Sequence, residues 1–204
     1  MLTSNHSAHA KNMLPASQLQ TFTMPLGNGL LSQTAVTIRP ATGADLDMLV
    51  DLHGRLSDET LFKRYLRPYR PTVRDIAFIV NLSQSQGAAV IATTTSRQRE
   101  VAIGLAYYVV EDTAHPVTAE PAFVVDDWYQ GQGLGTKLFE ALRQTAVAHQ
   151  IKAFNAVMHP ANSSMLRIFQ RSGLPLRQCR GYGEREVHIR LKPTVSKRYL
   201  DSAV

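Results

Sequence analysis

Apolar residues along the chain follow two periods, and the change from one to the other predicts the order of strands and helices. Alternating or continuous short apolar runs predict strands, and apolar residues at every third or fourth position predict amphipathic helices. The predicted strands cover residues 36–39, 88–95, 101–110, 120–125, 151–158, 176–182 and 186–191. The predicted helices begin near residues 42, 57, 72, 134 and 162. This order indicates one α/β domain.

The most informative stretch is a strand, a glycine-rich loop and a helix in direct succession. Residues 120–125 form a short apolar run, and Gly131, Gly133 and Gly135 precede a helix. One face of that helix is apolar and carries Leu134, Leu138, Leu142 and Ala146. Glycines let the backbone approach a ligand closely, and the first N–H groups of a helix have no intrahelical partner. Because the helix dipole adds to these groups, the stretch predicts a pyrophosphate site.

The order of residues in the loop excludes two common phosphate motifs. A Walker A loop ends in Gly-Lys-Ser/Thr, whereas a threonine comes before the lysine after Gly135. A dinucleotide fingerprint needs glycine at its sixth position, where this chain, counted from Gly131, has Thr136. The pattern that fits is Gln130-x-x-Gly133-x-Gly135 directly after a strand. It resembles motif A of the GNAT superfamily of acetyl-CoA-dependent N-acetyltransferases.

A second motif carries the same resemblance further along the chain. Asn162, Met165, Phe169 and Gly173 follow the GNAT spacing Asn-x-x-Ala/Met-x-x-x-Tyr/Phe-x-x-x-Gly, again on a predicted helix. The two motifs lie at the expected places in one pattern of strands and helices. The resemblance covers residues 36–192.

The resemblance implies a GNAT fold of the α/β (α+β) class, with a mixed, twisted sheet of six to seven strands and helices on both faces. In this fold the two central parallel strands splay apart. The chain predicts their direction independently, because residues 120–125 and 151–158 are strands joined by a helix, and a right-handed crossover makes them parallel. We expect the GNAT domain over residues 35–192, a flexible extension over 1–34 and a tail over 193–204.

The resemblance also implies where acetyl-CoA would bind as cosubstrate. The expected cofactor-binding residues lie on the central strand, in the loop, at the helix start and in the second motif: Phe123, Val124, Val125, Gln130, Gly131, Gln132, Gly133, Leu134, Gly135, Thr136, Asn162 and Phe169. Backbone amides around Val124 and Val125 are expected to pair with pantetheine and to polarise the thioester carbonyl. We expect no metal, because the histidines lie on different elements without the spacing of zinc ligands.

Residues 57–65, Ser-Asp-Glu-Thr-Leu-Phe-Lys-Arg-Tyr, predict a short helix capped by Ser57. The stretch resembles one in Pat-type bacterial protein lysine acetyltransferases, which implies that this helix covers the acceptor side of the site. The alternative is an amphipathic surface helix without such a role. The basic residues over 63–74 could attract nucleic acid, but no recognisable nucleic-acid motif accompanies them, and we expect no such partner.

Transfer of acetyl to an amine needs a base, because a lysine ammonium with a pKa of about 10.4 has no lone pair for the attack. Burial among apolar neighbours raises the pKa of a carboxylate and makes it a better base. Glu120 follows Ala119 and precedes Pro121, Ala122 and Phe123 in the sequence. In GNAT protein acetyltransferases a Glu on this strand is the general base, and the resemblance implies that role for Glu120. The alternative is a Glu at the strand edge that faces solvent.

The departing thiolate takes up a proton, and many GNAT enzymes supply it from a Tyr on the last helix. Here that position is Phe169, which cannot donate one. Water, Tyr107, Tyr108 or no acid at all are the candidates, because a thiolate is a good leaving group.

These patterns predict an acyltransferase that acetylates a primary amine, with a protein lysine as the expected acceptor and a small-molecule amine as the alternative. A non-catalytic CoA-binding sensor module is the hypothesis of a different class. Phe169 favours the sensor, whereas the carboxylate of Glu120 favours the enzyme.

Composition adds expectations about location and partners. The chain has 204 residues, of which 44% are hydrophobic, and no run approaches the ~18 apolar residues of a membrane span, so we expect no membrane partner. One cysteine, Cys179, and no recognisable signal sequence predict a cytoplasmic protein. The net charge of +6 comes from residues 167–204, with nine basic and three acidic residues. They favour an acidic partner or the phosphates of CoA, with a solvated basic face as the alternative.

Overall fold

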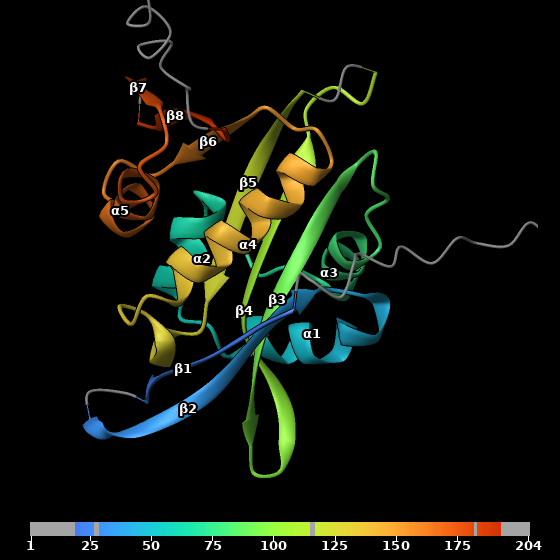
Figure 1. Cartoon of the computed structure of the whole chain (residues 1–204), viewed down its shortest axis with the longest axis vertical. Helices are drawn as coiled ribbons and strands as arrows, with labels where there is room; N and C mark the ends of the chain where they lie inside the picture. Colours follow the sequence, from blue (N-terminus) through green and yellow to red (C-terminus); the bar gives the residue numbers. More distant parts are fainter. Residues whose placement is uncertain (1–18, 27–28, 115–116, 182, 193–204) are drawn as a thin grey trace, which may run out of the picture.

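The computed structural model describes residues 19–26, 29–114, 117–181 and 183–192. The predicted tail, residues 193–204, and residues 1–18 of the predicted extension lie outside the described residues. The described residues form an eight-stranded sheet in the order β1-β2-β3-β4-β5-β6-β8-β7, with helices on both faces (Figure 1). The strands are β1 (Gln20–Leu26), β2 (Gly29–Pro40), β3 (Gly87–Ser96), β4 (Arg99–Val110), β5 (Thr118–Val125), β6 (Ala153–Met158), β7 (Leu176–Arg180) and β8 (Arg185–Arg190). The α-helices are α1 (Leu46–Arg55), α2 (Asp58–Tyr65), α3 (Val73–Val80), α4 (Leu134–Ala148) and α5 (Ser163–Arg171).

Polar side chains cap three of the helices where the sequence predicts a helix start. Ser57 caps α2 and accepts a hydrogen bond from the backbone N–H of Thr60 at 3.2 Å. Thr72 and Asp75 form a capping box at the start of α3. Asn162 caps α5 in the same way as Ser57 caps α2. Each cap satisfies an N–H group that the helix leaves unpaired, which fixes the position of the first turn.

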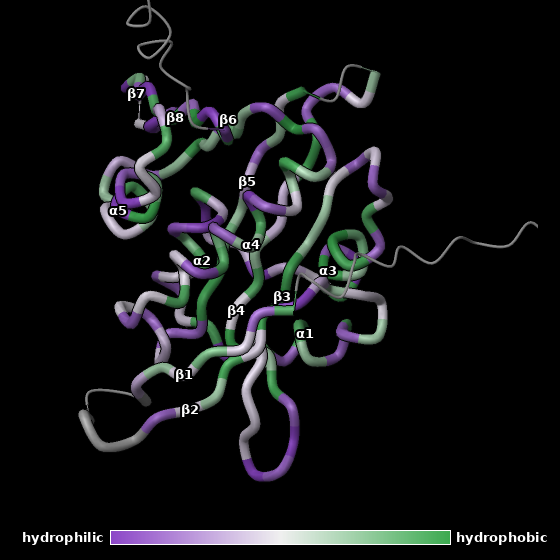
Figure 2. Tube along the Cα trace, viewed as in Figure 1, coloured by the Kyte–Doolittle hydropathy of each residue, from purple (hydrophilic) through white to green (hydrophobic). Residues whose placement is uncertain are grey.

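Two apolar clusters hold helices against opposite faces of the sheet. On one face, α4 and α5 bury Leu138, Phe139 and Phe169 against the strands. On the other face, α1, α2 and α3 bury a second cluster that includes Leu49 and Leu61. In Figure 2 the central strands are mostly apolar, and the tip of the β3–β4 hairpin is hydrophilic. The predicted arrangement of helices on both faces is confirmed.

β5 and β6 are parallel, as predicted, and they separate soon after they begin. Among the described residues, the register pairs only Thr118 and Ala119 of β5 with residues of β6. β5 continues to Val125, and β4 pairs with it to that end. The other edge of β5 is therefore open from Glu120 onward, and a wedge-shaped gap forms in the sheet.

The prediction of a flexible extension up to residue 34 is wrong from Gln20 onward. This stretch forms β1 and the first part of β2, which pair as an antiparallel hairpin at the edge of the sheet. Phe22 and Met24 alternate with threonines and pack on the α4 face. Pro25 and the polar composition hid this period of two, but an edge strand tolerates proline because one of its sides forms no ladder hydrogen bonds. The hairpin adds the eighth strand to the six or seven expected.

Candidate active site

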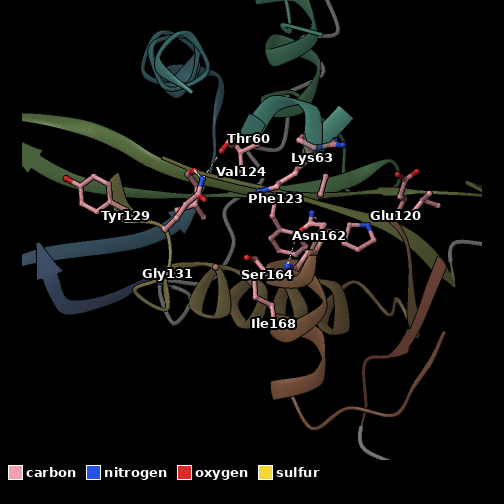
Figure 3. Close-up of a pocket in the computed structure, with 18 residues that line it drawn as sticks. Thr60, Lys63, Glu120, Phe123, Val124, Tyr129, Gly131, Asn162, Ser164 and Ile168 are labelled. Atoms are coloured by element: carbon pink, nitrogen blue, oxygen red, sulfur yellow. Dashed lines mark hydrogen bonds between the residues drawn. The ribbon is translucent and has the colours of Figure 1, made fainter. Parts of the chain in front are cut away.

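A pocket opens at the gap between β5 and β6, with α2 on one side and α5 and the loop before α4 on the other (Figure 3). Most of the predicted site residues line this pocket: Glu120, Phe123, Val124, Val125, Gln130, Gly131, Gly135 and Asn162. The remaining predicted residues do not line it: Gln132, Gly133, Leu134, Thr136 and Phe169. The fold therefore brings together the central strand, the loop and the second motif.

Several pocket residues were not predicted from the sequence. α2 contributes Thr60, Lys63 and Arg64, and α5 contributes Ser164 and Ile168. Ser164 and Ile168 lie four residues apart on one face of α5, so the helical period could have found them. The resemblance of residues 57–65 implied that this helix covers the acceptor side, and α2 does line the pocket, but the sequence did not show which of its side chains face β5.

The loop before α4 leaves the N-terminus of that helix open. Gly131 and Gly133 have φ values of 74° and 90°, in the left-handed region that favours glycine. Gly133 is the N-cap residue, and no side chain caps the helix, in contrast to Ser57 on α2 and Asn162 on α5. The N–H of Thr136 donates to the carbonyl of Gly133 at 3.1 Å, and the N–H groups of Leu134 and Gly135 before it lie at the positive end of this 15-residue helix. Such an N-terminus suits a phosphate or pyrophosphate group.

Gly135 is required for packing as well. A Cβ atom at this position would lie 2.7 Å from Cδ1 of Ile168 on α5. A Cβ atom at Gly131 or Gly133 would meet no protein atom within 4 Å. Gly135 therefore lets α4 and α5 approach each other, while the other two glycines leave open space in front of the loop.

Phe169 belongs to the core and not to the pocket. Its side chain is 0% exposed and packs against Phe139 and Phe123, with ring centroids 5.4 and 6.3 Å away. Phe169 does not line the pocket, because the inward face of α5 turns the ring toward α4, and its expected contact with the cofactor stays a prediction. Leu134 is also buried, at 1% exposure, so only its backbone can face the loop.

The backbone of β5 presents specific groups to the gap. The N–H of Asp126 donates to the carbonyl of Ile103 on β4 at 2.9 Å. Since successive residues of a strand point their N–H groups in opposite directions, the N–H of Val124 also faces β4, and those of Phe123 and Val125 face the gap. The N–H of Val124 therefore cannot make the expected contact with pantetheine. Only the N–H groups of Phe123 and Val125 are available for it. The Nε2 atom of Gln130 donates to the carbonyl of Val125 at 3.0 Å.

A hydrogen-bond network joins α2 to the loop; it consists of Ser57, Thr60, Asp127 and Gln130 and is called the Asp127 network below. The Asp127 carboxylate accepts bonds from the Ser57 backbone at 2.9 Å, the Ser57 hydroxyl at 2.8 Å and the Thr60 hydroxyl at 2.7 Å. Gln130 donates to the Thr60 hydroxyl at 2.9 Å. Burial alone would raise the pKa of the Asp127 carboxyl, but the bonds from Thr60 and Ser57 outweigh it and lower the pKa. The network therefore holds the start of α2 beside the loop.

Two cationic side chains of α2 line the pocket, and they have different interaction partners. Lys63 forms an ion pair with Glu59 one turn earlier on the same helix. Arg64 donates a hydrogen bond to the Tyr107 hydroxyl on β4. Its guanidinium also lies 4.8 Å from the ring centre of Tyr65 and 5.3 Å from that of Tyr107. Burial is the main reason that the pKa of Tyr65 is raised to about 12.

Glu120 lines the pocket at the end away from Gly131, as Figure 3 shows. The expectation that apolar neighbours bury its side chain is wrong, because the side chain is exposed. Residues adjacent in a strand point to opposite faces, so Ala119 and Phe123 pack on the α4 face and Glu120 points to the α2 face. The carboxylate is therefore accessible from solvent at the mouth of the pocket.

Tyr108, one of the predicted proton donors, lies away from the pocket. It is 0% exposed, and its hydroxyl forms a 2.7 Å hydrogen bond with Nδ1 of His149. Burial raises the pKa of the Tyr108 hydroxyl and lowers that of His149. Tyr107 points to the other face, where Arg64 contacts its hydroxyl. Of the two tyrosines, only Tyr107 lies near the pocket residues.

A second pocket lies on β6, β8 and β7 and shares one lining residue, Val157, with the first. Its polar lining consists of Asn155, Arg177, Gln178, Cys179, Glu186 and His188. Val157, whose exposed fraction is 39%, lines both pockets. Asn155 donates to the Glu111 carboxylate at 2.8 Å and accepts from Nδ1 of His188 at 2.7 Å. The second pocket is thus a polar sheet surface that borders the first pocket at Val157.

Comparison with known families identifies this architecture. The family model described as the acetyltransferase (GNAT) domain matches residues 35–175. The chain belongs to the GNAT acetyltransferase family. The fold expected from the two sequence motifs is confirmed by this match together with the eight-stranded sheet and its splayed central strands.

Individual relatives of this GNAT domain are distant. It is 27% identical to Acetyltransferase Pat of Mycolicibacterium smegmatis over 136 residues, which are 67% of this chain and 40% of that protein. The chain therefore spans about two fifths of the length of this curated relative. The crystal structure of the GNAT domain of S. lividans PAT has a TM-score of 0.71 at 24% identity, over 86% of this chain and 98% of that chain. The structure of yncA from Salmonella typhimurium with its cofactor acetyl-CoA has a TM-score of 0.62 at 16% identity, over 81% and 99%.

Two further properties follow from the described part of this GNAT domain. Within it, no three His, Cys, Asp or Glu side chains come close enough to hold a metal ion. None of the helices in the described ranges is both long and apolar enough to cross a membrane.

Proposed function

We propose that residues 35–192 form an acetyl-CoA-dependent N-acetyltransferase that acetylates a primary amine, a protein lysine, by direct attack with Glu120 as general base. The observation that carries the proposal is a single pocket that contains an exposed carboxylate, an open strand edge and the loop before an uncapped helix. These are the three parts that direct acetyl transfer requires: a base, a site for the thioester and a site for phosphate.

In this proposal, the pyrophosphate of acetyl-CoA binds the backbone of residues 130–136 at the start of α4. Its pantetheine arm pairs with the N–H groups of Phe123 and Val125 in the gap, and α5 covers it through Asn162 and Ile168. Support comes from the yncA neighbour, a structure with acetyl-CoA. Hydrogen bonds to the thioester carbonyl would be worth most in the transition state, where negative charge develops on that oxygen.

The reaction needs a neutral amine at the thioester carbonyl. Glu120 takes a proton from the acceptor ammonium, and the amine lone pair forms a C–N bond to the carbonyl carbon. The attacking nitrogen then loses its second proton to solvent, the tetrahedral intermediate collapses, and the C–S bond breaks. CoA leaves as a thiolate, which takes up a proton from water or Tyr107. An exposed carboxylate passes its proton to solvent without a relay, which resets the base.

A protein lysine is favoured over a small amine by the second pocket. Val157 joins it to the first, so a chain segment on β6, β8 and β7 could extend its lysine toward Glu120. The relative in Mycolicibacterium smegmatis, Acetyltransferase Pat, and the S. lividans PAT domain agree with the resemblance of residues 57–65. A small cavity closed on all sides would have favoured a free metabolite.

The test replaces Glu120 with Gln, which keeps the shape but cannot accept the proton. Turnover should fall by about 10²–10⁴, while the Kd of acetyl-CoA stays within about twofold. Glu184→Gln, an exposed carboxylate on the β7–β8 turn, is the matched control and should retain full activity.

Acceptors are found by incubating the protein with labelled acetyl-CoA and a whole-cell lysate, then with a panel of amines. Label on protein lysines supports the proposal. Label only on a small amine would show that the acceptor is a small molecule and not a protein lysine. Binding of acetyl-CoA without transfer in either assay would instead indicate a CoA sensor.

A further inference from the structure

Arg64 is a cation in the pocket whose charge no carboxylate neutralises within the described residues. Its contacts are the Tyr107 hydroxyl and the faces of two tyrosine rings. Lys63, the neighbouring cation, has Glu59 as its ion-pair partner. The third charged residue that lines the pocket is Glu120, on β5.

The two rings hold the Arg64 side chain in a defined place. Tyr107 lies opposite Ala122 in the β4–β5 register, two residues along β5 from Glu120 and on the same face of the sheet. A guanidinium stacked on Tyr65 and Tyr107 loses little further freedom when it binds an anion, and its planar fork fits a carboxylate with two parallel hydrogen bonds. Arg64 uses only part of its five N–H donors for Tyr107.

We infer that Arg64 selects acceptors that carry a carboxylate next to the amine that is acetylated. The inference rests on the proposed transfer with Glu120 as base. The amine lies at Glu120, and the carboxylate binds the guanidinium of Arg64 on α2. The positive charge of Arg64 repels an ammonium group and therefore disfavours a purely cationic acceptor. A carboxylate on the acceptor neutralises this repulsion.

The carboxylate has two sources. It belongs either to an Asp or Glu beside the target lysine in a protein or to the acceptor itself, as in a free amino acid. Both present an amine and a carboxylate to one pocket. The second pocket, which shares Val157 with the first, offers a surface for the protein source.

The experiment compares matched acceptors with the full chain and acetyl-CoA. One pair is a blocked peptide with a single lysine flanked by Glu and the same peptide with Gln in place of Glu. The other pair is free lysine and cadaverine, which lacks the carboxylate. The wild type should prefer the carboxylate member of one pair by about tenfold or more in kcat/KM, in the range of a charge-assisted hydrogen bond. The pair that shows the preference identifies the source.

Arg64→Leu should remove the preference, so that the ratio of kcat/KM between the two members of the pair falls to about one. Arg64→Lys keeps the charge without the fork and should restore part of the preference. Arg67→Leu is the matched control, because Arg67 also stacks on a tyrosine, Tyr69 at 4.7 Å, but does not line the pocket. It should leave the preference unchanged.

Equal turnover of both members of each pair by the wild type would overturn the role of Arg64 and leave the proposed transfer intact. An undiminished preference in a folded Arg64→Leu variant would overturn it as well. Transfer to no acceptor in any arm would contradict the proposed function, and the role of Arg64 would fall with it.

Discussion

The pocket has two sides that are built in different ways. The proposed cofactor side consists of the edge of β5 and the loop up to Gly135, a continuous stretch that presents backbone N–H groups. The acceptor side consists of side chains, with Glu120 on β5 and Lys63 and Arg64 on α2, which are far apart in the sequence. A backbone site depends on local conformation, and a side-chain site depends on how helices and strands pack.

This difference has a consequence for substitution. Side chains on the acceptor side can change without altering the backbone that holds the cofactor, so one domain architecture can serve different acceptors. Changes on the cofactor side act through glycine conformation and through the packing of α5 on α4. The expected effects therefore separate into the Kd of acetyl-CoA, the KM of the acceptor and the stability of the fold.

Loss of the aromatic core beneath the cofactor side should have the largest effect on stability. Phe169→Ala removes a fully buried ring from its contacts with Phe139 and Phe123, and the free energy of unfolding should fall by about 3–5 kcal/mol. Urea unfolding measures it. Phe78→Ala on α3, where the ring is 54% exposed, is the control and should cost no more than about 0.5 kcal/mol. Similar losses in both variants would contradict a structural role for Phe169.

Gly133→Ala should weaken the cofactor side without unfolding the chain. A residue with a Cβ atom in the left-handed region costs roughly 1–2 kcal/mol, and relief of that strain turns the first N–H groups of α4 away from the phosphate. The Kd of acetyl-CoA should rise by about tenfold in calorimetry, the equivalent of about 1.4 kcal/mol. Gly183→Ala introduces the same strain at φ 82° in the β7–β8 turn and should leave that Kd unchanged. An unchanged Kd in Gly133→Ala would place the phosphate elsewhere.

Asp127→Asn should change the KM of the acceptor much more than the Kd of acetyl-CoA. It weakens the Asp127 network that holds α2, so the KM of a lysine peptide should rise roughly fivefold, the equivalent of about 1 kcal/mol of hydrogen bonding. The Kd of acetyl-CoA should change little, because the loop backbone is not part of the carboxylate contacts. Asp58→Asn is the control. Asp58 lies on α2, its side chain is 91% exposed and pairs with Arg70, and the substitution should change neither the KM nor the Kd measurably. A parallel rise in both constants would show that the two sides act as one unit.

The smallest expected effect is a change of stability with pH, which comes from His53 on α1. Burial lowers the pKa of His53, so below about pH 6.5 the unfolded chain binds more protons than the folded one, and stability should fall as the pH falls from there. His53→Leu should reduce the change in Tm between pH 7 and pH 5. His149, whose pKa burial also lowers, should keep part of the slope. A slope that His53→Leu leaves intact would assign the effect to other groups.

Sequence alone was sufficient for the features that depend on local conformation. The caps at Ser57 and Thr72, the hairpin of β3 and β4, the parallel β5 and β6 and the glycine loop were all predictable, because hydrogen bonds between near neighbours and the periods of two and 3.6 determine them. The family followed from the spacing of two motifs. The β1–β2 hairpin was missed, because Pro25 and a polar composition masked a weak alternation.

Only the tertiary structure decided which way side chains point and which distant residues meet. Sequence neighbours suggested that Glu120 is buried, but strand alternation sends Ala119 and Phe123 to the α4 face, and the carboxylate is exposed. The motif suggested that Phe169 touches the cofactor, but helix packing turns it into the core. The motif of residues 57–65 suggested that the helix lies over the acceptor side, but only the Asp127 network and the packing of α2 show that Arg64 faces the pocket beside β5. These outcomes depend on the relative placement of whole elements, and no short stretch of sequence encodes it.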